Sequence, residues 1–184
     1  MNVSIKELMV PLAEYATISQ EATLNEAIRA LEAAQAQFDA SRYRHRAILA
    51  LDDDGKVVGK LTQMDTIKAM DPDYVEKLDE VSLARFGISS EYLERTLTEH
   101  EIQALSLPDL CRGVGRLRVA DVMHSPAEGE YIDIEASMQE TVRRFDTTGQ
   151  HSLLVTQDEC IIGVLRLTDV FAAICQAVKD AAED

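Results

Sequence analysis

The amino-acid sequence contains one pattern twice, and this internal repeat constrains the fold more than any other feature. The matched segments are residues 5–9 and 119–123, 22–31 and 136–145, and 57–65 and 161–169. Members of the first two pairs are 114 residues apart and members of the third are 104 apart, so the first copy carries ten extra residues between Leu31 and Ala47. A chain with two such copies is expected to fold as two similar units that pack together.

Both copies predict the same order of elements, β-α-β-β-α. In the first copy the pattern predicts strands over residues 16–18, 47–51 and 57–61 and a last helix over 64–70. In the second copy it predicts strands over 130–132, 153–156 and 161–165 and a last helix from 168 to roughly 178. Thr23-x-x-Glu26 and Ser137-x-x-Glu140 are capping boxes that mark the start of the first helix of each copy. About 60 residues is marginal for an independent core, so the predicted fold class is α/β (α+β), with the two repeats packed as a pseudo-symmetric pair.

A helical insert separates the two copies. It covers residues 71–117, which places the first repeat at 1–70 and the second at 118–184. The spacing of apolar residues in the insert predicts helices over about 74–86 and 90–105. The insert is either a linker folded over the repeats or a surface for a dimer or a partner protein.

The chain is strongly acidic, with 33 Asp and Glu against 18 Lys and Arg and a net charge of −15. Such a surface repels phosphate backbones and anionic lipid headgroups, so we expect neither nucleic acid nor a membrane as a partner. No apolar run is long enough to cross a bilayer, and the three cysteines form no C-x-x-C motif. These features favour a protein of the reducing cytoplasm.

The sequence offers no motif for catalysis or for metal binding. None of the four histidines has a partner three or four residues away, as a metal pair on a helix would require. A nucleophile elbow and a phosphate-binding lysine loop are both lacking. We therefore expect a protein that is not an enzyme and has no metal site.

The strongest functional motif is a run from glycine to aspartate that occurs once in each copy. It reads Gly59-Lys-Leu-Thr-Gln-Met-Asp65 in the first copy and Gly163-Val-Leu-Arg-Leu-Thr-Asp169 in the second. The copies open with Leu8-Met9-x-Pro11 and Val122-Met123-x-x-Pro126. Together these motifs resemble a tandem pair of CBS domains, often called a Bateman module.

The resemblance implies an adenosine-containing small molecule as the ligand: AMP, ADP or ATP, or else S-adenosylmethionine or a dinucleotide. It implies no required cofactor, and it implies a homodimer of two modules. In the family the aspartate of the run holds the ribose hydroxyls, and the Thr or Ser hydroxyl assists. By this resemblance the first site contains Thr62, Asp65, Ala16 and Ile18, and the second contains Asp169, Arg166, Ile132 and Leu153.

Several of these positions have a second interpretation. Thr62-x-x-Asp65 is also an N-cap pattern that needs no ligand. Arg166 either binds a phosphate or pairs with Asp169 over an empty pocket. Arg44 and Arg46 belong to the densest basic cluster of the chain, and they either receive the phosphates of the nucleotide or are solvated residues that pair with nearby acids.

Two functions are therefore in competition. The first is a regulatory, energy-sensing module that binds an adenine nucleotide and acts through conformation, assembly or an effector protein. The alternative is a ligand-free scaffold for homodimerisation or protein–protein interaction. Lys60 and Arg166 depart from the family pattern and favour the scaffold, whereas the intact Thr62 and Asp65 favour the sensor.

Overall fold

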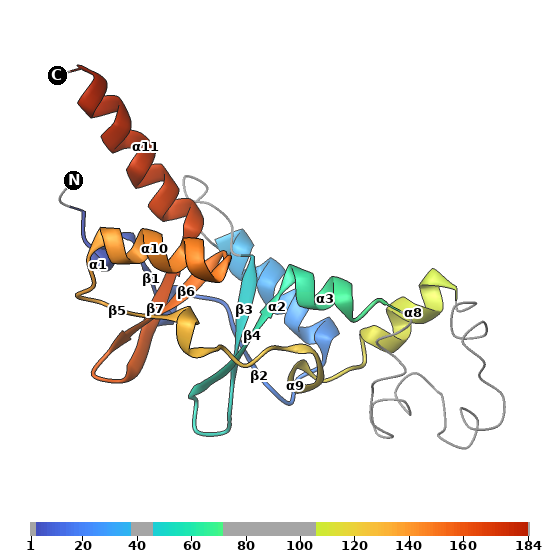
Figure 1. Ribbon diagram of the computed structural model, residues 1–184. Helices are drawn as coiled ribbons and strands as arrows, with labels where there is room; N and C mark the ends of the chain where they lie inside the picture. Colours follow the sequence, from blue (N-terminus) through green and yellow to red (C-terminus); the bar gives the residue numbers. More distant parts are fainter. Residues whose placement is uncertain (1–2, 38–45, 72–105, 184) are drawn as a thin grey trace. The chain divides into compact units, whose positions relative to one another are not determined.

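The computed structural model describes residues 3–37, 46–71 and 106–183 and shows a mixed α/β chain with two small sheets (Figure 1). The predicted α/β class and the two β-α-β-β-α repeats are confirmed. The helices predicted over 74–86 and 90–105 lie outside the described residues, as does Arg44.

The helices and strands of the repeats agree closely with the predicted ranges. The first copy comprises α1 (Ile5–Leu8), β1 (Val10–Pro11), η1 (Leu12–Glu14), β2 (Thr17–Ser19), α2 (Leu24–Gln37), β3 (Ala47–Leu51), β4 (Val57–Thr62) and α3 (Gln63–Lys68). The helix α8 (Leu107–Val114) comes next. The second copy comprises α9 (Val119–Val122), η2 (Glu128–Glu130), β5 (Tyr131–Asp133), α10 (Met138–Thr148), β6 (Ser152–Gln157), β7 (Cys160–Arg166) and α11 (Leu167–Glu183). The last helix continues to Glu183 instead of ending near Val178, because the residues after Val178 are mostly good helix formers without Gly or Pro.

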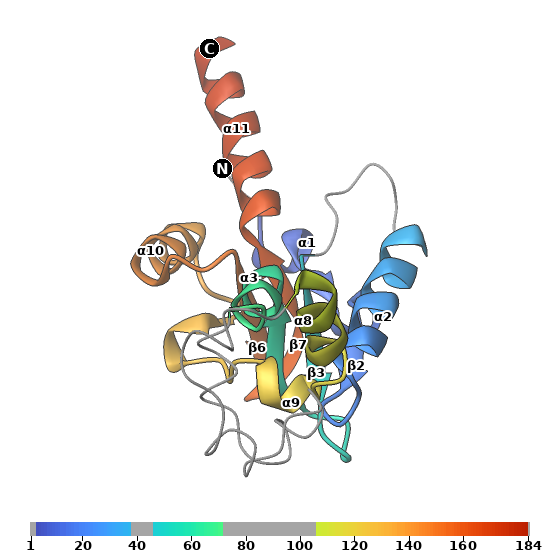
Figure 2. The same cartoon turned by 90° about the vertical axis from the view of Figure 1, so that its right-hand side faces the viewer.

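The described residues form two compact units. Unit 1 contains residues 3–16 and 126–183, and unit 2 contains residues 17–37, 46–71 and 106–125. In unit 2 the sheet order is β2-β3-β4, with β2 parallel and β4 antiparallel to β3, and α2 runs alongside β2 and β3 (Figure 2). In unit 1 the order is β1-β7-β6-β5, with β5 parallel to β6 and the other pairs antiparallel.

Each sheet is completed by the opening segment of the other copy. In unit 1, β1 comes from the first copy but pairs with β7 of the second, with Val10 opposite Val164. In unit 2, His124 comes from the second copy but pairs with Lys60 of β4 in the first. His124 and Val10 hold equivalent places in the repeat, as do Lys60 and Val164. The two copies therefore exchange their opening segments through equivalent positions of the repeat.

The motif glycines lie where these opening segments pass closest. A Cβ on Gly163 would lie 2.6 Å from the carbonyl oxygen of Val10 and 3.1 Å from the Sδ of Met9. A Cβ on Gly59 would overlap the Sδ of Met123. Each motif glycine thus packs against the opening segment of the other copy, near its methionine. Only a residue without a side chain leaves room for that segment.

We expect Gly163→Ala to destabilise the protein by roughly 1–3 kcal/mol, because the new methyl group meets the backbone of Val10, which is held by sheet pairing. Gly59→Ala should cost less, because the methionine side chain that it meets can change rotamer. Urea unfolding of both variants measures the difference. Equal losses in the two variants would contradict the assigned contacts.

Candidate functional site

The first candidate site lies at the junction between β4 and α3. Thr62 is the last residue of β4 and the N-cap of α3, with extended backbone angles. Its backbone N–H and its hydroxyl both donate to Oδ2 of Asp65, at 2.8 and 2.6 Å, and the Asp65 N–H donates back to Oγ1 at 3.2 Å. The capping interpretation of these two residues is confirmed. A cap of this kind fixes the carboxylate in one orientation at the helix start.

His124 is a third member of this cluster, and the sequence patterns did not identify it. Its Nδ1 lies 3.1 Å from Oδ2 of Asp65. Backbone hydrogen bonds to Lys60, of 3.0 and 3.2 Å, hold His124 beside β4. All three donors on Asp65 use Oδ2, and no donor from the described part of the chain lies on Oδ1. The Asp65 side chain is 12% exposed, and the acceptor capacity of Oδ1 is not used by a donor from the described residues.

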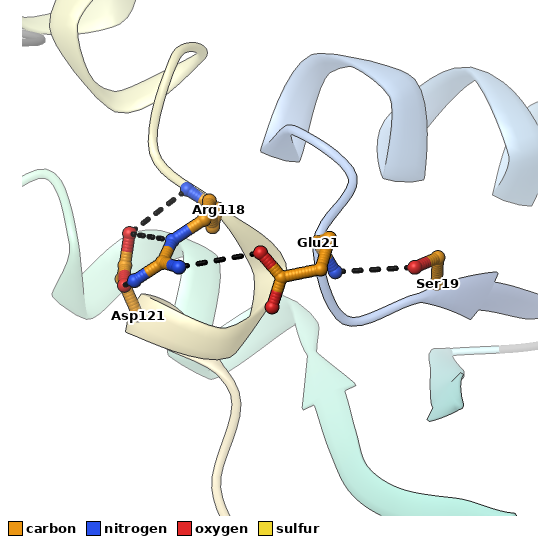
Figure 3. A network of polar contacts seen from close by, with 4 residues as sticks. All are labelled: Ser19, Glu21, Arg118 and Asp121. Carbon is orange, nitrogen blue, oxygen red and sulfur yellow. Dashed lines mark hydrogen bonds and ion pairs between the residues drawn. The ribbon is translucent and has the colours of Figure 1, made fainter. Parts of the chain in front are cut away.

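The segment that carries His124 is tied to the rest of unit 2 by a polar network (Figure 3). Arg118 pairs with Asp121 at 2.9 Å and with Glu21 at 3.2 Å, and the N–H of Glu21 donates to Oγ of Ser19 at 3.2 Å. The two carboxylates, Asp121 above all, hold the pKa of Arg118 above its ordinary value. The network joins α9 to the turn between β2 and α2, and so it fixes the route of the chain toward His124.

The second candidate site contains an internal ion pair. Arg166 ends β7, at the position of Thr62 in the first copy, and its guanidinium is bidentate on Asp169. Nε lies 2.5 Å from Oδ2 and Nη2 lies 2.8 Å from Oδ1. The side chains of Arg166 and Asp169 are 5% and 14% exposed. The interpretation in which Arg166 pairs with Asp169 is confirmed.

A buried tyrosine belongs to the surroundings of this ion pair. Tyr15 lies between η1 and β2 and is 6% exposed. Burial raises the pKa of Tyr15 to about 12, with Arg166 lowering it and Asp169 raising it. The two side chains of the ion pair, at 5% and 14% exposed, are likewise largely buried.

The remaining residues that the resemblance implies for the two sites differ in their burial and in the unit to which they belong. Ile132 and Leu153 belong to the apolar core of unit 1 and are at most 2% exposed. Ala16 is buried in unit 1, whereas Ile18 is half-buried in β2 of unit 2. Arg46 is exposed. The structure thus joins Thr62 to Asp65 and Arg166 to Asp169, and the ligand roles of the other residues stay predictions.

No helix in the described part of the chain is long and apolar enough to cross a membrane. The same residues contain no group of three or more His, Cys, Asp or Glu that could hold a metal ion.

A comparison with protein families matches the CBS domain model at two segments, residues 5–72 and 119–176. The comparison with curated proteins found no significant match. Among solved structures, the chain is similar to the CBS domain of a CBS-domain-containing membrane protein from Sphaerobacter thermophilus, with 20% identity and a TM-score of 0.57 over 92% of this chain and 86% of that chain.

Two further similar structures hold adenine nucleotides. The first is CBSX2 in complex with AMP, with 15% identity and a TM-score of 0.59 over 96% of this chain and 98% of that one. The second is the cytosolic domain of the Mg²⁺ channel MgtE in complex with ATP, with 17% identity and a TM-score of 0.55 over 94% of this chain and 49% of that one. At these identities the likeness shows the fold alone.

Alkaline pH should destabilise the protein through Tyr15. The raised pKa means that stability is intact below pH 10, the pKa of an unfolded tyrosine, and is lost as the pH rises through about 12. At pH 11 the loss assigned to Tyr15 is about 1 kcal/mol. Urea unfolding of wild type and Tyr15→Phe between pH 9 and pH 11 measures this loss. Between these pH values the free energy of unfolding should fall by about 1 kcal/mol less in the variant than in the wild type. Tyr131→Phe, a change of a half-buried tyrosine in the same unit, is the control. Parallel pH profiles for wild type and Tyr15→Phe would contradict the assignment.

Proposed function

The chain belongs to the CBS domain family, and we propose that it is a regulatory module that binds an adenine nucleotide, AMP, ADP or ATP, at Thr62 and Asp65. The observation that carries the proposal is the Asp65 carboxylate, which is held through Oδ2 and keeps Oδ1 without a donor among the described residues. The AMP and ATP complexes among the similar structures support the choice of ligand class.

The chemistry of the site suits a ribose. A carboxylate oxygen accepts hydroxyl hydrogen bonds that are charge-assisted, worth about 1.5–3 kcal/mol each at most. Thr62 and His124 already fix the orientation of Asp65, so little side-chain freedom is lost when a ligand binds. We assign the phosphates to Arg44 and Arg46, because they belong to the densest basic cluster of this acidic chain and Arg46 is exposed.

The position of His124 supports a route for the signal. The side chain of His124 contacts Asp65 within unit 2, and only Ser125 separates it from the point where the chain enters unit 1. A nucleotide regulates only through a difference in its affinity for two states. A ligand on Asp65 that alters the His124 contact acts directly on this crossing segment, and the output passes to an effector protein or to the assembly.

The assembly that we propose is a homodimer through the last helices of the repeats. Ile67 on α3 and Phe171 on α11 hold equivalent places in the two copies and are 63% and 61% exposed. Met64 and Val178 on the same two helices are also more than half exposed. Large apolar side chains repeated in this way favour a contact with a second copy of the chain, since a two-fold interface uses the same surface on both partners.

A ligand-free scaffold is the second candidate function. The observation that favours it is the closed ion pair of Arg166 and Asp169, which satisfies the second-copy carboxylate without a ligand. In this alternative the exposed residues of α3 and α11 still form the interface.

The cysteines support a cytoplasmic setting for this function. Cys111 and Cys160 are free and exposed, and Cys175 is free and half-buried. Exposed free thiols are typical of a reducing compartment.

Asp65→Ala should weaken nucleotide binding at least about tenfold, because it removes the acceptor of the ribose hydroxyls. Calorimetric titration with AMP, ADP and ATP measures the affinity. The matched control is Glu26→Ala, which removes a carboxylate from a similar capping box, where the N–H and the hydroxyl of Thr23 donate to Glu26 at 2.7 Å. This variant suffers a comparable loss of helix capping and should keep the affinity of the wild type. No binding by the wild-type protein would sink the sensor and leave the scaffold.

Phe171→Glu and Ile67→Glu should shift the protein from dimer to monomer, because each places a charge in the proposed apolar contact. Analytical ultracentrifugation at micromolar concentration measures the mass in solution. Val142→Glu, on α10 at a residue that is 42% exposed, is the control and should stay dimeric. A wild-type protein that sediments as a monomer, or variants that remain dimers, would refute this interface.

A further inference from the structure

The two copies differ at one decisive position, where the first has Thr62 and the second has Arg166. We propose that Arg166 is an internal occupant of the second-copy site, so that each chain binds one nucleotide, at the first copy alone. The inference rests on the proposed function, since it assigns the stoichiometry of that nucleotide binding. Arg166 is then the residue that decides which repeat is open to a ligand.

The hydrogen bonds of the two aspartates carry the inference. Donors approach only Oδ2 of Asp65, and none from the described residues lies on Oδ1. At Asp169, by contrast, Nε and Nη2 of Arg166 engage both oxygens, at 2.5 and 2.8 Å. The fork therefore leaves no oxygen of Asp169 without a donor, whereas Asp65 keeps Oδ1 for a ribose hydroxyl. The guanidinium therefore stands in the place of the ligand.

Burial and charge make this occupant hard to displace. The Arg166 side chain is 5% exposed, and its backbone is paired to Ser152 inside the sheet of unit 1. A ribose that took over Asp169 would break a bidentate ion pair of a buried guanidinium, and such a loss is unfavourable. A neutral diol offers weaker hydrogen bonds than a cation does. Replacement of the Arg166 guanidinium by a ribose at Asp169 is therefore unfavourable.

The opening segments support the same asymmetry. In unit 2 the opening segment supplies His124, whose Nδ1 lies 3.1 Å from Oδ2 of Asp65. In unit 1 the equivalent residue is Val10, which is fully buried and has no polar side chain. Asp169 therefore depends on Arg166 for the contacts that Thr62 and His124 share at Asp65.

Calorimetric titration with AMP, ADP and ATP tests the proposal on four proteins: wild type, Asp65→Ala, Arg166→Thr and Thr62→Arg. Wild type should bind one nucleotide per chain, and Asp65→Ala should lose it. Arg166→Thr gives the second copy the Thr-x-x-Asp cap of the first and should raise the stoichiometry to two. Thr62→Arg should close the first copy and abolish binding, while circular dichroism verifies that each variant is folded.

The outcomes separate this inference from the function on which it rests. Two nucleotides on the wild-type chain, or one retained by Asp65→Ala, would overturn the internal occupant while nucleotide binding stands. A folded Arg166→Thr that still binds one nucleotide would overturn it as well. If Arg166→Thr does not fold, the comparison of wild type with Asp65→Ala still decides. No binding to wild type or to Arg166→Thr would overturn the proposed function, and this inference with it.

Discussion

The close approach of each opening segment to a motif glycine is the contact on which the rest of the structure depends. At Gly163 the backbone of Val10 takes the space of a Cβ, and at Gly59 the side chain of Met123 does so. This packing fixes the register of the opening segment against the sheet. It therefore also determines which residue follows the methionine into the sheet: His124 beside Lys60 in unit 2, and Val10 beside Val164 in unit 1.

Because the segments are exchanged, neither copy completes its own sheet. Residues near the start of the chain must reach β7, and the segment after α9 must reach β4, before either sheet is whole. Units of this size bury only a modest core, so the loss of one edge is a large fraction of their stability. The carboxylate of Asp65 shares this dependence, since its contact with His124 exists only after the exchange. Folding and the candidate site are thus coupled through the same strand pairings.

The sequence predicted the features that local patterns determine. The β-α-β-β-α elements of both repeats, and the caps at Thr23, Thr62 and Ser137, follow from the spacing of apolar residues and from hydrogen bonds that span three residues. The elements of the opening segments were not predicted. The role of His124 could not be predicted in this way, because its contact with Asp65 depends on pairing between segments far apart in the chain. One signal in the sequence could have indicated this contact. Met123-His124 of the second opening segment aligns with Met9-Val10 of the first, and each pair could then be matched with a glycine motif.

The two aspartates show how one strand–helix junction supports opposite chemistry. A carboxylate can be oriented by neutral neighbours that use a single oxygen, as Thr62 orients Asp65, and it then keeps an acceptor for an incoming hydroxyl. It can also be neutralised by a guanidinium that uses both oxygens, as at Asp169, and it then has little to offer a ligand. The backbone and the carboxylate are the same in both cases. The two junctions differ in the residue before the helix, Thr62 or Arg166, and in the residue of the opening segment, His124 or Val10. These neighbours, and not the aspartate itself, distinguish the two carboxylates.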